Sequence, residues 1–255
     1  MKIKFGHWLL ALIIAISIIF IFTRINKKAG SEEQDVIVAG TAANFPPFEF
    51  KQDGELTGFD VDLMQALAQR LHKKLVWKDI DFTNLLLEAQ MGQIHVIASA
   101  LTPTPERAQQ VLFLPTYLEH DPLIVITRKD APAPKSLADL KGKEVIVNDG
   151  YTAEAFMQQQ EGVTLKRIGS VAEAFLALNA GRGDAFVSAR SATQAFFDRM
   201  GSANYNILPL EKDETYAIAV SKQHAALHAA LKKVYAQLEK DGTLQALKEK
   251  WHLVW

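Results

Sequence analysis

The stretch Gly58-Phe59-Asp60-Val61-Asp62-Leu63 says more about the fold of this chain than any other segment. Apolar Leu67, Ala68 and Leu71 follow it at helical spacing, and Asn44-Phe45-Pro46-Pro47-Phe48-Glu49-Phe50 comes shortly before it. The spacing predicts a helix that starts near Asp60, which would be its cap, and that buries one apolar face. Strands with short apolar sequences are expected on both sides of this helix.

Apolar runs and amphipathic segments alternate along the remaining chain, which predicts an α/β fold with parallel sheets. Thr104 followed by Pro105 is a typical start of a helix, with Thr as the cap and Pro in the first helical position. We expect strands near 36–40, 75–77, 95–99, 123–127, 143–148 and 185–188, and helices near 84–91, 152–159, 171–180, 224–240 and 243–251.

Three further motifs accompany the opening ones: Ser99-x-x-Thr102-x-x-x-x-Arg107, Asp241-Gly242-Thr243 and Lys250-Trp251. With them the chain, over about residues 36–255, resembles the polar amino-acid-binding proteins, which are family 3 solute-binding proteins and serve ABC importers in the periplasm. The resemblance implies the type II periplasmic binding fold, with two lobes that each contain a doubly wound, mostly parallel sheet and that two crossing strands join. It implies lobe 1 at 36–126 with 218–255, and lobe 2 at 127–217.

Composition narrows the possible functions. The 255 residues carry a formal net charge of −1, so nucleic-acid binding has no electrostatic footprint. There is no cysteine, which excludes disulfides, a thiolate zinc site and a lipid-modified cysteine anchor. His224 and His228 have helical metal-pair spacing without a third ligand, so we expect neither a metal nor a cofactor.

The N-terminus predicts export. Lys2 and Lys4 precede an uncharged apolar run from Trp8 to Phe22, which is typical of a secretory signal. No small-x-small cleavage site follows, so we expect residues 1–28 to be an uncleaved membrane anchor and 29–35 a polar tether. A cleaved signal with an atypical site and a buried helix of the folded domain are the alternatives. The expected location is the periplasm, on the inner membrane.

Arg107 is the strongest candidate for a ligand-binding residue. It falls in the first turn of the helix that Thr104 opens, where free backbone N–H groups already favour an anion. A guanidinium there can hold a carboxylate through two parallel hydrogen bonds. In the family that the chain resembles, the segment that matches Ser99, Thr102 and Arg107 holds the α-carboxylate of the ligand. A surface arginine in helix ion pairs is the alternative.

Aromatic side chains are expected at the other end of the site. Phe45 and Phe82 match positions at which relatives place a ring over the ligand's side chain, and both could instead be core residues. In lobe 2, Asp149, Tyr151 and Thr152 join a strand to a helix, where open α/β sheets bind ligands. Thr152 matches a hydroxyl that relatives direct at the carboxylate, and Tyr151 replaces a smaller residue. Asp149 and Thr152 could also be simple helix caps.

Two positions depart from the family pattern. Ala189 stands where relatives carry the acid that neutralises the α-ammonium group, and Ala42 stands where relatives with cationic ligands carry another acid. A buried ammonium without a partner costs several kcal/mol. Either Asp149 or Glu154 therefore supplies the charge, or the ligand lacks an ammonium and Arg190 is a second anion contact.

The resemblance implies a binding protein without catalytic residues, which binds a polar amino acid or a small carboxylate between its lobes and docks on an ABC permease. A dehydratase of the cyclohexadienyl dehydratase type, with Glu154 or Asp149 as the acid, is the alternative on the same fold. A membrane-tethered sensory lobe is a third possibility.

Overall fold

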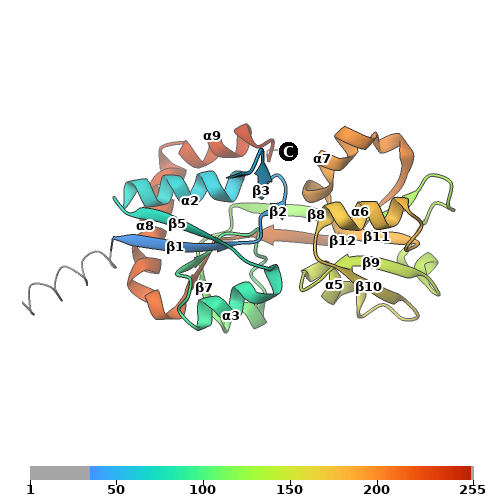
Figure 1. Ribbon diagram of the computed structural model, residues 1–255, viewed down its shortest axis with the longest axis horizontal. Helices are drawn as coiled ribbons and strands as arrows, with labels where there is room; N and C mark the ends of the chain where they lie inside the picture. The colour runs from blue at the N-terminus through green and yellow to red at the C-terminus, as the bar shows by residue number, and fades with distance from the viewer. Residues whose placement is uncertain (1–34, 254–255) are drawn as a thin grey trace, which may run out of the picture.

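The computed structural model describes residues 35–253, so the predicted anchor and all but the last residue of the predicted tether lie outside the described residues. Two five-stranded sheets lie side by side along the long axis of the molecule, each with helices packed on its faces (Figure 1). The α/β, two-lobed fold predicted from the sequence is confirmed. Within residues 35–253, no helix combines the length and apolar character needed to cross a membrane.

The first sheet contains three parallel strands followed by two strands that alternate in direction. In spatial order its strands are β5 (Lys74–Asp79), β1 (Val36–Thr41), β6 (Val96–Ile97), β13 (Ala219–Ser221) and β7 (Val111–Phe113). The helices of this lobe are α2 (Phe59–Arg70), α3 (Leu85–Gln90), α4 (Pro105–Ala108), α8 (Ala225–Lys240) and α9 (Thr243–Lys250). A small antiparallel sheet of β2 (Asn44–Phe45), β3 (Glu49–Gln52) and β4 (Glu55–Thr57) precedes α2.

The second sheet repeats this arrangement, with three parallel strands and then two antiparallel neighbours. Its order is β10 (Thr164–Ile168), β9 (Glu144–Asn148), β11 (Ala185–Ala189), β8 (Leu118–Arg128) and β12 (Tyr205–Tyr216). Its helices are α5 (Thr152–Met157), α6 (Val171–Asn179) and α7 (Arg190–Met200). The central strands of both sheets lie where the sequence predicted strands, whereas β10, β12 and α7 were not predicted.

The decisive stretch forms α2 as predicted, but the helix begins at Phe59 and its cap position is Gly58. Gly58 has φ 134°, and an added Cβ would lie 2.1 Å from the carbonyl oxygen of Phe48, so only glycine fits this close approach. Asp60 is therefore not the helix cap. It is fully buried inside the first turn, where its Oδ2 accepts the backbone N–H of Ala100 at 2.8 Å.

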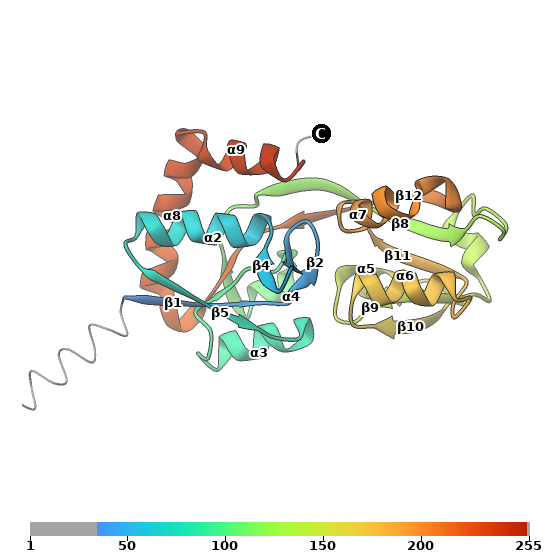
Figure 2. The same cartoon turned by 45° about the horizontal axis from the view of Figure 1, so that its top comes forward.

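Strands β8 and β12 connect the two lobes (Figure 2). They pair antiparallel, with register shifts between Pro209 and Asp213 and between Glu214 and Tyr216, where the pair approaches the first lobe. The predicted lobe boundaries lie within β8, at 126/127, and just after β12, at 217/218. They remain a prediction about where the two lobes divide.

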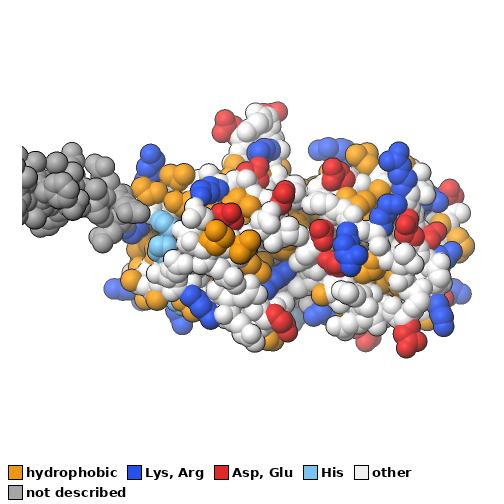
Figure 3. Space-filling model, turned by 60° about the horizontal axis from the view of Figure 1, so that its bottom comes forward, with side chains coloured by type: hydrophobic (Ala, Val, Ile, Leu, Met, Phe, Trp, Pro, Cys, Tyr) orange, Lys and Arg blue, Asp and Glu red, His pale blue; other side chains and the backbone are white. Residues whose placement is uncertain are grey.

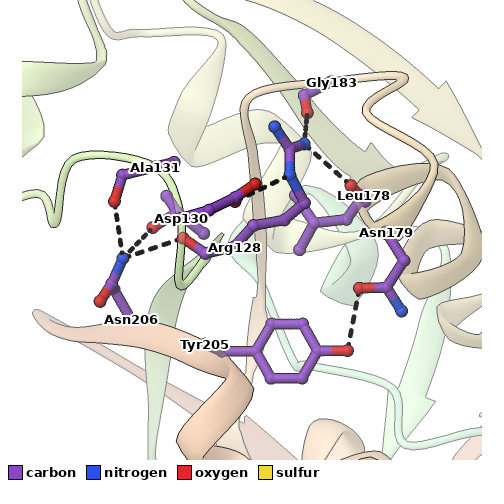
Figure 4. Close-up of polar contacts among 9 residues, drawn as sticks. Arg128, Asp130, Ala131, Leu178, Asn179, Gly183, Tyr205 and Asn206 are labelled. Atoms are coloured by element: carbon purple, nitrogen blue, oxygen red, sulfur yellow. Dashed lines mark hydrogen bonds and ion pairs between the residues drawn. The ribbon is translucent and has the colours of Figure 1, made fainter.

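A set of polar contacts fixes the outer end of the second lobe (Figure 4). The Arg128 guanidinium donates to the carbonyl oxygens of Leu178 at 3.1 Å and Gly183 at 3.5 Å, which join the end of β8 to the segment after α6. Asn206 of β12 donates to the Arg128 carbonyl oxygen at 2.9 Å. These contacts hold the lobe together at the end away from the first lobe.

Acidic and basic side chains are interspersed over the face in Figure 3, as the net charge of −1 suggests. The core consists of fully buried apolar side chains from both sheets and from the helices packed on them, such as Ile37, Phe59, Ile126 and Phe186. Phe48 of the segment before β3 is also fully buried.

Candidate functional site

The parallel strands of both sheets direct their carboxyl ends at the junction between the lobes, which is where open α/β sheets bind ligands. A cleft lies there, with about 350 Å³ of space including the part that opens to solvent. Residues of both lobes and both crossing strands line it: Phe45, Phe82, Ser99, Ala100, Thr102, Arg107, Leu123, Tyr151, Thr152, Ala153, Ser188, Ala189, Glu214 and Tyr216.

Arg107 occupies the centre of this arrangement. The predicted helix start exists, because the Thr104 hydroxyl accepts the Arg107 backbone N–H at 3.3 Å. The guanidinium is 9% exposed and donates to two carbonyl oxygens at 3.0 Å, Thr102 of the first lobe and Gly150 of the second. It also lies 5.5 Å from the centre of the Phe82 ring. A guanidinium has five N–H groups, so donors remain for an anion.

Glu214 lies in the same cleft and was missed by the sequence analysis. It is 2% exposed on β12, close to the end of the crossing strand. Its Oε2 accepts the hydroxyl protons of Thr102 and Thr152, each at 2.6 Å, one from each lobe. Its Oε1 is buried and has no hydrogen-bond partner. The available signal was one acidic residue four positions before residue 218, where the chain was predicted to return to lobe 1.

Charges in the cleft influence one another. Burial lowers the pKa of the Arg107 guanidinium, and the nearby negative charge of Glu214 opposes this shift. Burial also raises the pKa of the Tyr151 phenol, with the Glu49 carboxyl adding to the shift and Arg107 reducing it. Among the described residues that line the cleft, Arg107 and Glu214 are the only ones that ordinarily carry charge.

Three aromatic rings form the other end of the cleft. The Tyr151 ring lies 5.3 Å from the Phe45 ring and 4.2 Å from the Phe82 ring, measured between ring centres. Tyr151 comes from the second lobe and the two phenylalanines from the first. The larger residue at position 151 therefore contacts both rings that were predicted to cover the ligand's side chain.

Buried carboxyl groups support the floor of the cleft. The Ser99 hydroxyl donates to Glu49 Oε1 at 2.9 Å and accepts the Ala42 backbone N–H at 3.1 Å, so its proton is directed away from the cleft. Burial and the Asp60 charge raise the pKa of Glu49 well above its usual value. Burial likewise raises the pKa of Asp60 to about 7.

Seven of the eight predicted site residues line the cleft, and Asp149 does not. Asp149 is exposed. Glu154, the other acid proposed to supply a charge, pairs with Arg167 at 2.6 Å and accepts the Gly150 backbone N–H at 2.7 Å. Neither acid therefore provides the expected partner for an ammonium group, and neither is placed to be a catalytic acid in the cleft.

Three further positions bear on the charge of the ligand: Ala189, Ala42 and Arg190. Ala189 does line the cleft and is 5% exposed. Ala42 packs in an apolar cluster with Leu85 and Ile94 and is not part of the lining. Arg190 is exposed and borders a different cavity, so it is no second anion contact in this cleft. In the part of the chain that the structure describes, no group of three or more metal-ligating side chains is found.

Comparisons with known proteins show the family of the chain and support the same fold. Residues 37–254 match the family of bacterial extracellular solute-binding proteins, family 3. The arginine-binding extracellular protein ArtP of Bacillus subtilis is 30% identical over 250 residues, which cover 96% of this chain and 97% of that protein.

Two solved structures are similar in fold and sequence. An ancestral arginine-binding protein bound to arginine has a TM-score of 0.80 and 36% identity, covering 85% of this chain and 98% of its own. The ancestral amino-acid-binding protein AncCDT-1, described as a precursor of cyclohexadienyl dehydratase, has a TM-score of 0.77 and 29% identity, covering 86% and 96%. The chain belongs to the bacterial extracellular solute-binding proteins of family 3.

Proposed function

We propose that this chain is the solute-binding subunit of an ABC importer and that it captures an α-amino acid in the cleft between its lobes. The observation that carries this proposal is the meeting of Arg107, Thr102, Thr152 and Glu214 in one buried cleft. Relatives named for binding amino acids, arginine among them, point to the same class of ligand. A charged pair of opposite sign suits a zwitterion.

The ligand's carboxylate would bind Arg107. The guanidinium lies at a helix start, is almost fully buried, and has N–H donors beyond the two that hold Thr102 and Gly150. A charge-assisted bidentate contact in such a site is strong because little water competes for it. The ligand's side chain would then lie toward Phe45, Phe82 and Tyr151, where stacking and apolar contact are available.

Binding would be coupled to closure of the lobes about β8 and β12. Arg107 of the first lobe already donates to Gly150 of the second, and Thr102 and Thr152 meet on Glu214. A ligand that touches both lobes favours the closed form by the difference between its affinities for the two forms. The closed form would then dock on the permease.

The protein would bind its ligand without converting it. A dehydratase needs an acid placed in the cleft, and the two acids suggested for that role, Glu154 and Asp149, do not line it. Glu214 does line the cleft, but two threonine hydroxyls already donate to it. Release of unchanged ligand after binding would support the proposal, and turnover of prephenate would contradict it.

We also propose that the N-terminal segment stays on the protein and tethers it to the inner membrane. Trp8 to Phe22 is uncharged and apolar, and no small-x-small site follows it. Fractionation of cells, followed by N-terminal sequencing, tests this. A soluble product that begins near Ala29 would show that the segment is removed.

The central test is a melting-temperature screen of the full-length protein in mild detergent against the twenty L-amino acids, dicarboxylates and prephenate. A ligand that binds only the folded state raises the melting temperature, and the rise grows with the ratio of ligand concentration to dissociation constant. We expect at least one L-amino acid to stabilise the protein and to bind with a dissociation constant of about 1 μM or below by calorimetry. Stabilisation by dicarboxylates and by no amino acid would contradict the proposal.

A further inference from the structure

We infer that Glu214 supplies the negative charge that holds the α-ammonium group of the bound amino acid. It would take over, from a crossing strand, the task that relatives assign to the acid at the position of Ala189. This inference rests on the proposed function, because it assumes that the ligand is an α-amino acid.

The first support is the unequal state of the two carboxylate oxygens of Glu214. Oε2 accepts two hydroxyl protons at 2.6 Å, from Thr102 and Thr152. Oε1 is buried and accepts no hydrogen bond, and Glu214 as a whole is only 2% exposed. Leaving a buried carboxylate oxygen without a donor is costly, so a native structure usually provides one. An ammonium group of the ligand offers three N–H donors to the cleft.

The second support is the charge balance of the cleft. Among the lining residues that the structure describes, Arg107 is the one cationic side chain and Glu214 the one acidic side chain. A zwitterion with its carboxylate on Arg107 and its ammonium on Glu214 neutralises both. A dicarboxylate would instead bring additional negative charge beside a buried carboxylate, which is unfavourable.

The third support is elimination among the acids near the cleft. Asp149 is exposed and Glu154 is engaged by Arg167 and by the Gly150 backbone. Glu49 lies beneath Ser99, and neither Glu49 nor the buried Asp60 and Asp121 is part of the lining. Position 189 offers only a methyl group, and Glu214 is the acid that remains.

A competing explanation uses the same contacts. Glu214 could occupy the place of a ligand carboxylate, because it accepts hydrogen bonds from the two threonine hydroxyls that were predicted to bind the ligand's carboxylate. Glu214 would then compete with the ligand, and neutralising it would tighten the binding of every carboxylate. The two explanations therefore predict opposite results for Glu214→Gln, which has the same shape without the charge.

The experiment compares each amino acid with its desamino counterpart, so that the two probes differ only in the α-ammonium group. L-arginine is paired with 5-guanidinopentanoate and L-glutamine with 5-amino-5-oxopentanoate, and any stronger amino acid from the melting screen is paired in the same way. We expect the unchanged protein to prefer the amino acid. In Glu214→Gln the amino acid should bind roughly 10- to 150-fold more weakly and lose most of this preference.

Two further variants separate charge from structure. Glu211→Gln removes an exposed acid on the same strand and should keep the preference. The double change Glu214→Gln with Ala189→Asp places an acid at the position used by relatives and should restore at least part of the preference. If Glu214→Gln does not fold, Glu214→Asp retains the charge and should keep the preference at lower affinity.

An unchanged preference in folded Glu214→Gln, or tighter binding of both probes, would overturn the inference while leaving the proposed function in place. Loss of preference in Glu211→Gln as well, without rescue by the double change, would also overturn it, because the effect would then be structural. If no amino acid bound the unchanged protein, the proposed function itself would fail.

Discussion

The two lobes of this protein are built on the same frame but supply the cleft differently. Each sheet has three parallel strands followed by two that alternate in direction, in the orders β5-β1-β6-β13-β7 and β10-β9-β11-β8-β12. The strands β6 and β11 occupy equivalent places and end at the cleft with Ser99 and Ala189 close by. The frame is shared, so differences in function must come from the residues at the strand ends.

Most of the predicted ligand contacts come from the first lobe, and the departures from the family pattern that line the cleft come from the second. Thr102, Arg107 and the two phenylalanines come from the first lobe, whereas Tyr151 and Ala189 of the second are the departures. The acid that lines the cleft lies instead on the crossing strand β12, as Glu214. A site at a lobe junction can thus draw its charged groups from a crossing strand as well as from the strand ends.

Removing Arg107 from the first lobe should have the largest effect. In Arg107→Ala we expect amino-acid affinity to fall by roughly 2–5 kcal/mol, because a buried charge-assisted contact is lost. Calorimetry measures it, and the melting temperature of the unliganded protein shows whether the fold is kept.

Arg70→Ala is the matched control, since Arg70 is partly exposed and pairs with Asp241 at 2.7 Å on the outside of the same lobe. Affinity should not change in this control. If Arg107→Ala bound its amino acid within threefold of the unchanged protein, the carboxylate contact would lie elsewhere.

Two buried carboxyl groups beside the cleft, Asp121 and Asp60, differ in the number of hydrogen bonds that they accept. Burial raises the pKa of Asp121, and hydrogen bonds donated by the Ser191 backbone N–H and hydroxyl and by the Tyr216 hydroxyl oppose this shift. Asp60 of the first lobe has fewer such donors, and burial raises its pKa to about 7. The folded state therefore binds this proton more tightly than the unfolded chain, whose carboxyl has a pKa near 3.8.

Stability should accordingly fall as pH rises through 7. From these two pKa values, the unliganded protein should lose about 2–3 kcal/mol of unfolding free energy from Asp60 between pH 5 and pH 8. The raised pKa of the neighbouring Glu49 acts in the same direction. Asp60→Asn should flatten the profile, as measured by urea unfolding at each pH.

Asp53→Asn, at an exposed turn, should leave that profile unchanged. A profile of Asp60→Asn that still falls as steeply as that of the unchanged protein would assign the effect to other groups.

Ala189 tests the departure of the second lobe directly. We expect Ala189→Asp to raise the preference for an amino acid over its desamino counterpart by roughly tenfold, because a second acid favours an ammonium and repels a plain carboxylate. Ala192→Asp would be a poor control, since Ala192 is fully buried, so the exposed Ala195 is changed to Asp instead. A shift toward the desamino compound would indicate a ligand without an ammonium.

The sequence predicted much of the frame and most of the cleft because both depend on local signals. Thr104 and Pro105 predicted the helix that positions Arg107, and short apolar runs predicted the central strands. Strand β12 was missed because Pro209 and the charged run 211–214 are more typical of a loop than of a strand. Glu214 was missed with it, since its position in the cleft depends on long-range pairing with β8.

Other errors arose where a local signal had two possible uses. Asp149 and Glu154 lie in the motif of the second lobe, and sequence distance suggested that one would reach the ligand. Glu154 instead pairs with Arg167 of β10, a strand that the sequence did not reveal. Asp60 resembled a helix cap because it is acidic and precedes an apolar face, but its partner is the Ala100 backbone, forty residues away in the chain.

Tyr151 should give the smallest effect and the most informative comparison of the aromatic end. The ring lies against both Phe45 and Phe82, in the region where the side chain of a ligand would lie. Tyr151→Thr removes the ring and keeps a hydroxyl, so long side chains gain space between apolar surfaces while short ones gain no contact. We expect the affinity for arginine relative to alanine to rise by about three- to tenfold, on the order of 1 kcal/mol.

Tyr151→Phe is the control for this change, because it retains the ring and removes only the hydroxyl. Its ratio of arginine to alanine affinity should stay close to that of the unchanged protein, by calorimetry with both ligands. Equal ratios in Tyr151→Thr and Tyr151→Phe would mean that the ring does not limit the ligand's length. The limit would then lie with Phe82 of the first lobe, whose ring centre is 5.5 Å from the Arg107 guanidinium. In that case the first lobe, rather than the second, would determine which side chains the cleft accepts.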